Sequence, residues 1–339
     1  MKMPTIDADG TVHLPDVPVP YSALASAEAK AAFLRMVEEA KRTGPPNPNA
    51  PIEQQRQQED ARQIPIRDEL VKTFGVDIVP QMIGGVQTDV VLPKGGVAPR
   101  NKERVLINLH GGGFMTGARY GGQVESIPLA AIGGFKVVTV DYREGPEHHF
   151  PAASEDVATV YRELLKTYRP ENIGIYGCSA GGLLTTQSLA WFQAHGLPTP
   201  GAVGVFGSGG QIAGTGDSNY VSAPLMGWPM PPLPPGLDAT KVFPYFMGAD
   251  PADPLLSPAD HPDILRRFPP TLVISGTRDL ALSASIHLHS RLNALGVDAD
   301  LHVWEAQTHC GFLTPGVPES REAWEVIARF FDKRLGQRR

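Results

Sequence analysis

One short stretch of this chain restricts its fold more than any other. It is a serine at the centre of a G-x-S-x-G pattern, Gly177-Cys178-Ser179-Ala180-Gly181. The apolar run 173–176 before it is typical of a buried strand, and the alanine- and leucine-rich segment after it, to about Ala194, is typical of a helix. A strand, a tight turn with a serine at its apex and a helix are the setting that a nucleophile elbow requires. On its own, the pattern also fits an ordinary glycine-rich turn.

Strands and helices alternate along most of the chain. The expected strands are 76–83, 86–92, 104–109, 136–140, 173–176, 202–206, 271–275 and 299–305, and the expected helices are 124–132, 152–167, 182–194, 283–295 and 320–335. The first two strands, which two glycines separate, indicate a hairpin at a sheet edge. This alternation predicts an α/β fold with a mostly parallel central sheet covered by helices on both faces.

The N-terminal 75 residues have a different character. A proline-rich arm extends to about residue 20, an amphipathic helix is expected from Ser26 to Thr43, and a polar helix from Pro51 to about Arg62, ending before Pro65. These helices have too little apolar surface to fold alone. We therefore expect residues 1–75 to lie on the catalytic domain, 76–339, either as part of a cap over its site or as a purely structural extension.

A second irregular segment covers about residues 207–256 and is rich in glycine and proline. Its aromatic and methionine content argues against disorder. We expect a cap insertion that lines a substrate pocket; the alternative is a satellite core that packs on the sheet. The candidate pocket residues are Phe114, Met226, Trp228, Phe243, Tyr245 and Phe246.

Composition excludes several classes of protein. The chain has 339 residues, a formal net charge of −6, 42% hydrophobic and 19% charged residues. This charge offers no basic surface for nucleic acid. The first ten residues hold no apolar core of signal-peptide length, and no apolar run approaches the span of a bilayer. Two cysteines cannot build a disulfide framework, so we expect a cytoplasmic enzyme.

A serine nucleophile needs a base within hydrogen-bond reach and an acid that orients the base. Asp279 follows the strand 271–275, and His309 follows the strand 299–305. Loops at the carboxyl ends of parallel strands gather at one edge of a sheet. We therefore predict a triad of Ser179, Asp279 and His309. The ordinary alternatives are a helix N-cap for Asp279 and a turn residue for His309.

A run of glycines, His110-Gly111-Gly112-Gly113-Phe114, ends the strand 104–109. Acyl transfer creates an oxyanion that needs two or three N–H donors, and glycines let bare backbone approach a substrate. We predict an oxyanion hole made of the N–H groups of Gly111, Gly112 and Ala180. A phosphate-binding loop is the competing interpretation, but no lysine follows and the spacing does not fit a dinucleotide site. We expect no metal and no organic cofactor.

The glycine run and the serine pattern belong to a longer series of motifs. In chain order these are His110-Gly111-Gly112-Gly113, Asp141-Tyr142-Arg143, Pro146-Glu147-His148, Pro151-Ala152 and Gly177-x-Ser179-Ala180-Gly181-Gly182. Over about residues 76–335 the chain resembles the hormone-sensitive-lipase-like branch (bacterial family IV) of the α/β-hydrolases. The resemblance implies a carboxylesterase with a helical cap, built from the N-terminal helices and the insertion after the sixth strand, and often a homodimer through the last strand. It also implies a structural role for Tyr142, Arg143 and Glu147 beneath the oxyanion loop.

The sequence departs from that family in three places. Position 178 is usually acidic there and is Cys178 here; Asp279 is followed by Leu280-Ala281-Leu282 instead of Pro-Leu-x-Asp; Cys310 separates His309 from Gly311-Phe312. The two cysteines are expected to be small buried apolar residues. Because they adjoin Ser179 and His309, a sharper hypothesis places their thiols near the site, where alkylation or oxidation would slow the enzyme.

Together these features predict a serine carboxylic-ester hydrolase that acts on short- to medium-chain or cyclic esters through an acyl-enzyme intermediate. An amidase or peptidase with the same triad is the alternative among enzymes. A non-catalytic ligand receptor on the same fold is the alternative from another class. The expected partner is a small ester, with no nucleic acid and no membrane span.

Overall fold

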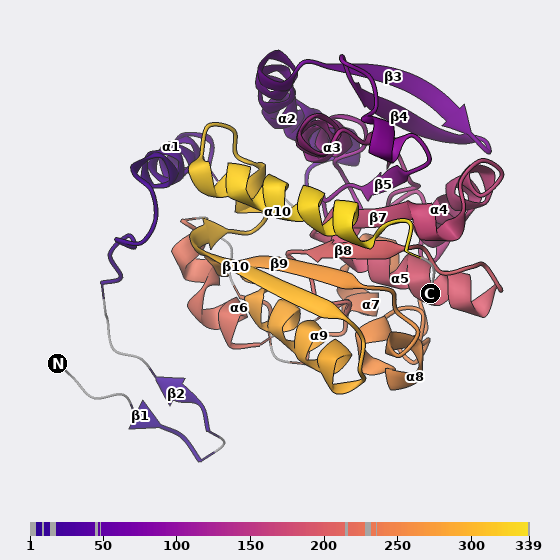
Figure 1. The fold of residues 1–339 in the computed structure, drawn as a ribbon. Helices are drawn as coiled ribbons and strands as arrows, with labels where there is room; N and C mark the ends of the chain where they lie inside the picture. Colours follow the sequence, from indigo (N-terminus) through magenta and orange to yellow (C-terminus); the bar gives the residue numbers. More distant parts are fainter. Residues whose placement is uncertain are drawn as a thin grey trace.

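The computed structural model describes residues 5–8, 10–13, 18–44, 47, 49–213, 216–227, 232–234 and 236–337. Within these residues, eight strands form one sheet in the order β10-β9-β8-β7-β5-β6-β4-β3 (Figure 1). The strands are β3 (Val76–Ile83), β4 (Val86–Pro93), β5 (Val105–Leu109), β6 (Lys136–Val140), β7 (Ile173–Cys178), β8 (Ala202–Phe206), β9 (Thr271–Arg278) and β10 (Ala299–Thr308).

The sheet is mostly parallel, as predicted. β3 pairs antiparallel with β4, and β4 antiparallel with β6, so the predicted hairpin forms one edge. The pairs from β6 through β5, β7, β8 and β9 to β10 are all parallel. The carboxyl ends of these strands therefore meet at one edge of the sheet, where ligands bind in open α/β folds.

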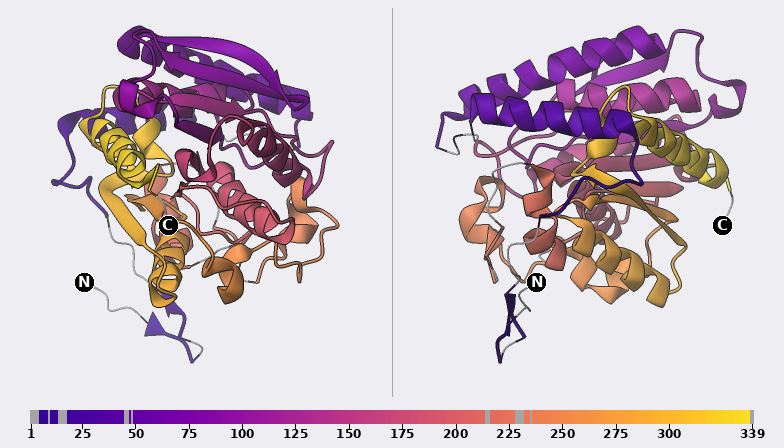
Figure 2. Two further views of the ribbon diagram at one scale, coloured as in Figure 1. Left: turned by 45° about the vertical axis from the view of Figure 1, so that its right-hand side comes forward. Right: turned by 90° about the vertical axis from the view of Figure 1, so that its left-hand side faces the viewer.

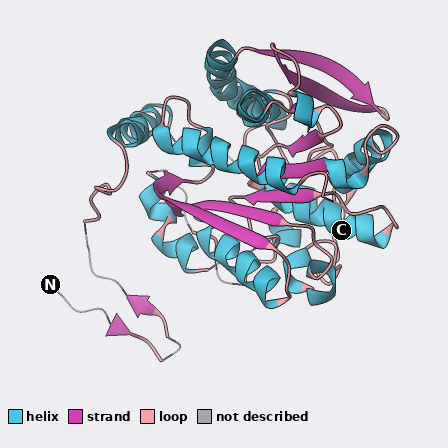
Figure 3. Ribbon diagram, in the orientation of Figure 1, coloured by secondary structure: helices cyan, strands magenta, loops and turns pink. Residues whose placement is uncertain are grey.

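Helices cover both faces of the sheet (Figures 1 and 3). The long helices are α1 (Ala27–Thr43), α2 (Ile52–Phe74), α3 (Tyr120–Gly133), α4 (Ala152–Leu164), α5 (Ala180–Ala194), α9 (Leu282–Ala294) and α10 (Pro318–Arg334). On one face α3 and α10 pack on the sheet, with Leu106, Ile127 and Phe331 in a shared apolar cluster. On the other face α4, α5 and α9 do so, with Val157, Ile175 and Leu288 in a second cluster. A sheet buried on both sides explains why its strands are apolar runs without alternation.

The predicted end of the second helix is wrong. α2 continues through Pro65 to Phe74 and lies on α3. A proline removes one helical hydrogen bond, that to the carbonyl of Ala61. Both Pro65 and Ala61 are exposed, so water can satisfy that carbonyl. Beyond the proline, Leu70 is only 1% exposed, and this burial outweighs the local break.

The N-terminal region reaches two distant parts of the chain. Residues of the expected arm include a small ribbon of β1 (Thr5–Ile6) and β2 (Val12–His13), which lies apart from the main body (Figure 2). Ser26 caps α1 and binds Glu319 at the start of α10, through its N–H (2.7 Å) and its hydroxyl (2.8 Å). Further along α1, Phe33 packs closely on Gly227 of the 207–256 segment: a Cβ at Gly227 would lie 3.0 Å from Phe33 Cζ. The N-terminal helix therefore bridges the last helix and the insertion.

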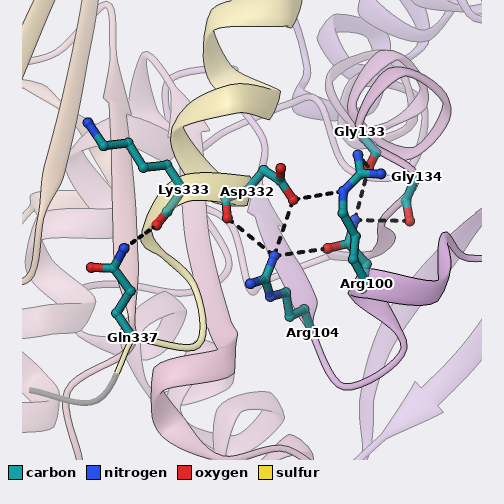
Figure 4. A network of polar contacts seen from close by, with 8 residues as sticks. Arg100, Arg104, Gly133, Gly134, Asp332, Lys333 and Gln337 are labelled. Carbon is teal, nitrogen blue, oxygen red and sulfur yellow. Dashed lines mark hydrogen bonds and ion pairs between the residues drawn. The ribbon is translucent and has the colours of Figure 1, made fainter.

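The C-terminal end of α10 is held by ion pairs to the turn that precedes β5. Arg100 and Arg104, in the turn before β5, converge on Asp332 (2.8 and 3.2 Å; Figure 4). This contact holds the last helix against the strand that carries the glycine run. No helix in the described residues is both long and apolar enough to cross a bilayer.

Candidate active site

Ser179 stands at the turn between β7 and α5 in a backbone conformation that residues other than glycine rarely adopt. Its φ is 59° and its ψ is −120°, and its N–H donates to the Phe206 carbonyl at the end of β8 (2.8 Å). The turn is tight, because a Cβ at Gly181 would collide with the carbonyl of Leu109 on β5. This strained strand–turn–helix is the geometry that a nucleophile elbow requires.

The structure brings the three predicted triad residues together. His309 Nε2 lies 2.8 Å from Ser179 Oγ, and His309 Nδ1 lies 2.8 Å from Asp279 Oδ1. Ser179 is partly exposed and the His309 side chain is 23% exposed, whereas Asp279 is almost completely buried. The row therefore runs from a buried carboxylate to an accessible hydroxyl.

The Asp279 carboxylate is held by two further donors. Oδ1 accepts from the N–H of Ala281 (2.8 Å), and Oδ2 accepts from the hydroxyl of Ser275 (2.9 Å). Sequence reasoning missed Ser275 as a partner, although it is the last residue of the expected strand 271–275. With these bonds the carboxylate cannot rotate freely, so it fixes the orientation of the imidazole.

Burial and charge oppose each other in the His309–Asp279 pair. Burial lowers the pKa of His309, but the charge of the Asp279 carboxylate and the hydrogen bond to it outweigh burial, so the imidazole pKa lies above its ordinary value. Burial raises the pKa of Asp279, but the imidazole and the other donors bring it below its ordinary value. The pair therefore favours an ionised carboxylate that stabilises a protonated imidazole.

The predicted oxyanion donors need one correction. The N–H of Gly111 donates to Glu125 Oε1 of α3 (2.9 Å) and is therefore not free to bind an oxyanion. Within the described residues, no acceptor binds the N–H of Gly112 or that of the next residue, Gly113. Ala180 is the first residue of α5, so its N–H has no acceptor within the helix. Of the predicted donors, the N–H groups of Gly112 and Ala180 therefore stay available, and Gly113 is a further candidate in the same loop.

Tyr142 and His110 support the glycine run from below. The Tyr142 hydroxyl donates to the His110 carbonyl (2.7 Å), and the two rings stack with centroids 4.2 Å apart. Burial lowers the pKa of His110 to about 4, although its hydrogen bond to Gly111 opposes the shift. The ring is therefore neutral at pH 7, and Nδ1 donates to the Gly111 carbonyl (2.8 Å).

Arg56 of α2 fastens the outer side of the same loop. Its Nε donates to the Met115 carbonyl (3.0 Å) and its Nη2 to the Gly145 carbonyl (3.0 Å), while both Nη atoms bind Glu147 at 2.8 Å. Glu147 therefore contacts the loop through Arg56. Sequence reasoning missed Arg56, because the partners of this guanidinium lie far away along the chain.

The predicted pocket residues divide into two groups. Phe114 (2% exposed) stacks on Tyr245 with ring centroids 4.6 Å apart, and Phe246 (4% exposed) packs edge-on against Phe114 at 5.1 Å. Met226 is buried too. The rings of Phe114, Tyr245 and Phe246 belong to the apolar cluster on the α4, α5 and α9 face of the sheet, and they expose almost no surface to a substrate. For these three residues the packing favours the alternative interpretation, a core that packs on the sheet.

The two remaining pocket candidates differ. Phe243 is half-buried and packs against the edge of this cluster. Trp228 lies outside the described residues. In its described part the insertion contains short helices: α6 (Asp217–Val221), α7 (Ala239–Val242) and two 3-10 helices, Ala223–Met226 and Pro244–Phe246.

Cys178 and Cys310 form a disulfide with a Cα–Cα distance of 6.3 Å. The hypothesis that they lie near the site is therefore confirmed, but the expectation of separate apolar thiols is wrong. Each cysteine adjoins a predicted triad residue, so the bond joins the serine turn to the histidine loop across 132 residues of sequence. Disulfides persist in oxidising compartments. The cysteine argument for a cytoplasmic location therefore fails, and that location stays a prediction.

Comparison with known proteins identifies the family. A family model described as an alpha/beta hydrolase fold matches residues 106–313. The chain belongs to this family. The matched range includes all three predicted triad residues.

Two relatives of this hydrolase carry names that describe an activity. An acetyl-hydrolase of Streptomyces hygroscopicus is 30% identical over 241 residues, which are 70% of this chain and 78% of the relative. The carboxylesterase/phospholipase LipF of Mycobacterium tuberculosis is 31% identical over 268 residues, which are 73% of this chain and 69% of the relative.

Solved structures agree with the predicted branch. Esterase E25 superposes on this hydrolase with a TM-score of 0.82 at 29% identity, covering 95% of this chain and 98% of its own. An esterase from the bacterial hormone-sensitive lipase family gives 0.76 at 27% identity, covering 92% and 100%. The hydrolase is therefore an esterase of this branch, as the motifs predicted.

The disulfide generates a prediction about stability. Replacing Cys178 and Cys310 together by alanine removes a cross-link that restricts the unfolded chain, so the free energy of unfolding should fall by about 2–4 kcal/mol. Urea unfolding with and without reductant measures the change. Reductant should lower the unfolding midpoint of the wild-type enzyme but not that of the double variant. Equal midpoints in all four samples would show that the cross-link contributes nothing.

Proposed function

We propose that this esterase hydrolyses short- to medium-chain or cyclic carboxylic esters with Ser179 as the nucleophile. The observation that carries the proposal is the unbroken row of hydrogen bonds from Ser179 Oγ through the His309 ring to Asp279. A serine is a poor nucleophile without a base in contact with its hydroxyl. Here the base and its orienting acid stand at bonding distance.

In the proposed mechanism, His309 takes the Ser179 proton as the hydroxyl attacks the ester carbonyl, and it then protonates the leaving alkoxide. Water repeats the sequence on the acyl-enzyme and releases the acid. Asp279 stabilises the imidazolium in both halves. The N–H groups of Gly112 and Ala180, with Gly113 as the third candidate, bind the oxyanion.

The limited space beside the glycine loop favours small substrates. Phe114, Tyr245 and Phe246 occupy that side with buried rings, and they would have to move before a long acyl chain could lie there. The name of the acetyl-hydrolase relative agrees with a short acyl group. We propose that α1 and the 207–256 segment form the cap over this site. A homodimer through the edge strand β10 stays a prediction from the family resemblance.

Removing the nucleophile tests the mechanism. Mixing enzyme with p-nitrophenyl butyrate should give a burst of p-nitrophenol of one equivalent per site, because acylation precedes the release of the acid. Ser179→Ala should abolish the burst and lower kcat by about 10⁴-fold or more. Ser222→Ala, a serine of the insertion, serves as the control. A burst that persists in Ser179→Ala would remove Ser179 as the nucleophile, and a wild-type protein that releases no p-nitrophenol at all would favour a non-catalytic receptor.

The pH dependence of kcat/KM tests the role of Asp279. His309 must be neutral to accept a proton, and its pKa is raised, so kcat/KM should rise with pH through a midpoint above the ordinary imidazole value of about 6.5. Asp279→Asn removes the charge that raises this pKa. It should move the midpoint down and lower kcat by about 10⁴-fold. Asp298→Asn, at the opposite end of β10, should leave the profile unchanged; a midpoint that Asp279→Asn does not move would contradict the role of the carboxylate.

Acyl length tests the substrate class. We expect kcat/KM to be highest for p-nitrophenyl acetate and butyrate and to fall by about tenfold or more at palmitate, since each further methylene needs apolar space that the buried rings already fill. A lactone and p-nitroacetanilide complete the series and separate esterase from amidase activity. Triolein cleaved as fast as the short esters would contradict the proposed range.

A further inference from the structure

Glu125 is a buried carboxylate that the proposed mechanism does not use. It is the only acidic residue of α3, and it is 6% exposed. In the described part of the chain no cation pairs with it; its partners are N–H donors. Burial raises the pKa of Glu125 to about 7, and the hydrogen bonds from Asn108, Gly111 and Cys178 oppose this shift. A buried carboxylate held only by neutral donors is costly unless each donor is well placed.

Three donors converge on this carboxylate from two different segments. Oε1 accepts from the N–H of Gly111 (2.9 Å). Oε2 accepts from Asn108 Nδ2 (2.9 Å) and from the N–H of Cys178 (3.3 Å). Asn108 is fixed in turn, because its Oδ1 accepts from the hydroxyl of Thr139 on β6 (2.8 Å).

The two backbone donors belong to the two parts of the site that must stay in register. Gly111 begins the glycine loop, and Cys178 directly precedes Ser179. The loop and the serine turn are already in contact there: a Cβ at Gly111 would lie 3.0 Å from the Cys178 carbonyl oxygen and 3.4 Å from Ser179 Cβ. One carboxylate therefore bridges the loop that carries Gly112 and the turn that carries Ala180.

We propose that Glu125 is a positioning residue for the oxyanion hole. Its carboxylate holds the glycine loop against the serine turn, so that the N–H groups of Gly112 and Ala180 point at one oxyanion. Glu125 does not touch the reacting atoms. The inference rests on the proposed serine mechanism and assigns to this side chain the alignment of that mechanism's donors.

Glu125→Gln is the direct test, because it keeps the size of the side chain and removes one acceptor. Whichever way the carboxamide turns, its NH2 group faces either the Gly111 N–H or the donors of Asn108 and Cys178. A displacement of the donors by about 1 Å lowers a rate by about 10²-fold. We expect the rate constant of the p-nitrophenol burst from p-nitrophenyl acetate to fall by about 10- to 100-fold, with a burst of one equivalent per folded chain.

The burst separates positioning from mere folding. Its amplitude counts competent sites, and its rate constant reports the chemistry in each site. The inhibition constant of phenylboronic acid, which forms a tetrahedral adduct with a catalytic serine, should rise by the same factor as the burst slows. A smaller amplitude with an unchanged rate constant and unchanged boronic acid affinity would overturn the proposal, since Glu125 would then only support the fold.

Two further variants secure the result. Gln123→Met alters another buried polar residue of α3, whose amide donates to Asp89 on β4 and not to the site; it should lower stability but leave the burst rate unchanged. Glu125→Asp keeps the charge and shortens the reach, so it provides a folded variant if Glu125→Gln is insoluble, and it should slow the burst in the same direction. Full burst rates in both Glu125 variants would refute the positioning role, while Ser179→Ala would still report on the mechanism itself.

Discussion

The contact of one imidazole with two distant side chains is the constraint on which the rest of this structure depends. His309 lies 2.8 Å from both Ser179 Oγ and Asp279 Oδ1, although the three residues stand on three separate loops. They meet because β7, β9 and β10 run parallel and end at one edge of the sheet. The two apolar clusters on either face of the sheet hold those strands in register.

A disulfide and a hydrogen bond to a buried carboxylate stabilise the arrangement of these loops, and Cys178 takes part in both. Its side chain joins the serine turn to the histidine loop through the disulfide with Cys310. Its N–H joins the same turn to Glu125, which also holds the start of the glycine loop. The position where the family usually has an acid is a cysteine here, and a carboxylate from α3 stands against its backbone. The turn that carries the nucleophile is thereby joined to the loop that carries its base by a covalent bond, and to the oxyanion loop by hydrogen bonds.

The sequence predicted the parts of this site that follow from local pattern and chain order. The strand limits of β6 and β8, the turn at Ser179 and the loops of Asp279 and His309 all depend on apolar runs and on what directly follows them. Contacts between distant segments were beyond such reasoning. Glu125 takes the Gly111 N–H that seemed free, and packing on α3 carries α2 past Pro65.

Contacts between distant segments also decide the two other outcomes that the sequence did not predict: the burial of the aromatic pocket candidates and the pairing of the cysteines. An insertion that lines a pocket and one that fills a core can contain the same aromatic residues. Only the structure, in which Phe114 stacks on Tyr245, distinguishes a core from a pocket here. Two cysteines 132 residues apart carry no signal of pairing in one sequence. Their places beside Ser179 and His309 did indicate that they would lie close to the site.

The central claim is that His309 makes Ser179 the single activated hydroxyl of this protein. Peptide mass spectrometry after treatment with diisopropyl fluorophosphate tests it most directly, because this reagent phosphorylates a serine that a neighbouring base has activated. The account predicts one adduct, on Ser179, formed in proportion to the loss of esterase activity and absent from His309→Ala. Full activity in a fully labelled sample, or an adduct on another serine that tracks the loss, would contradict it.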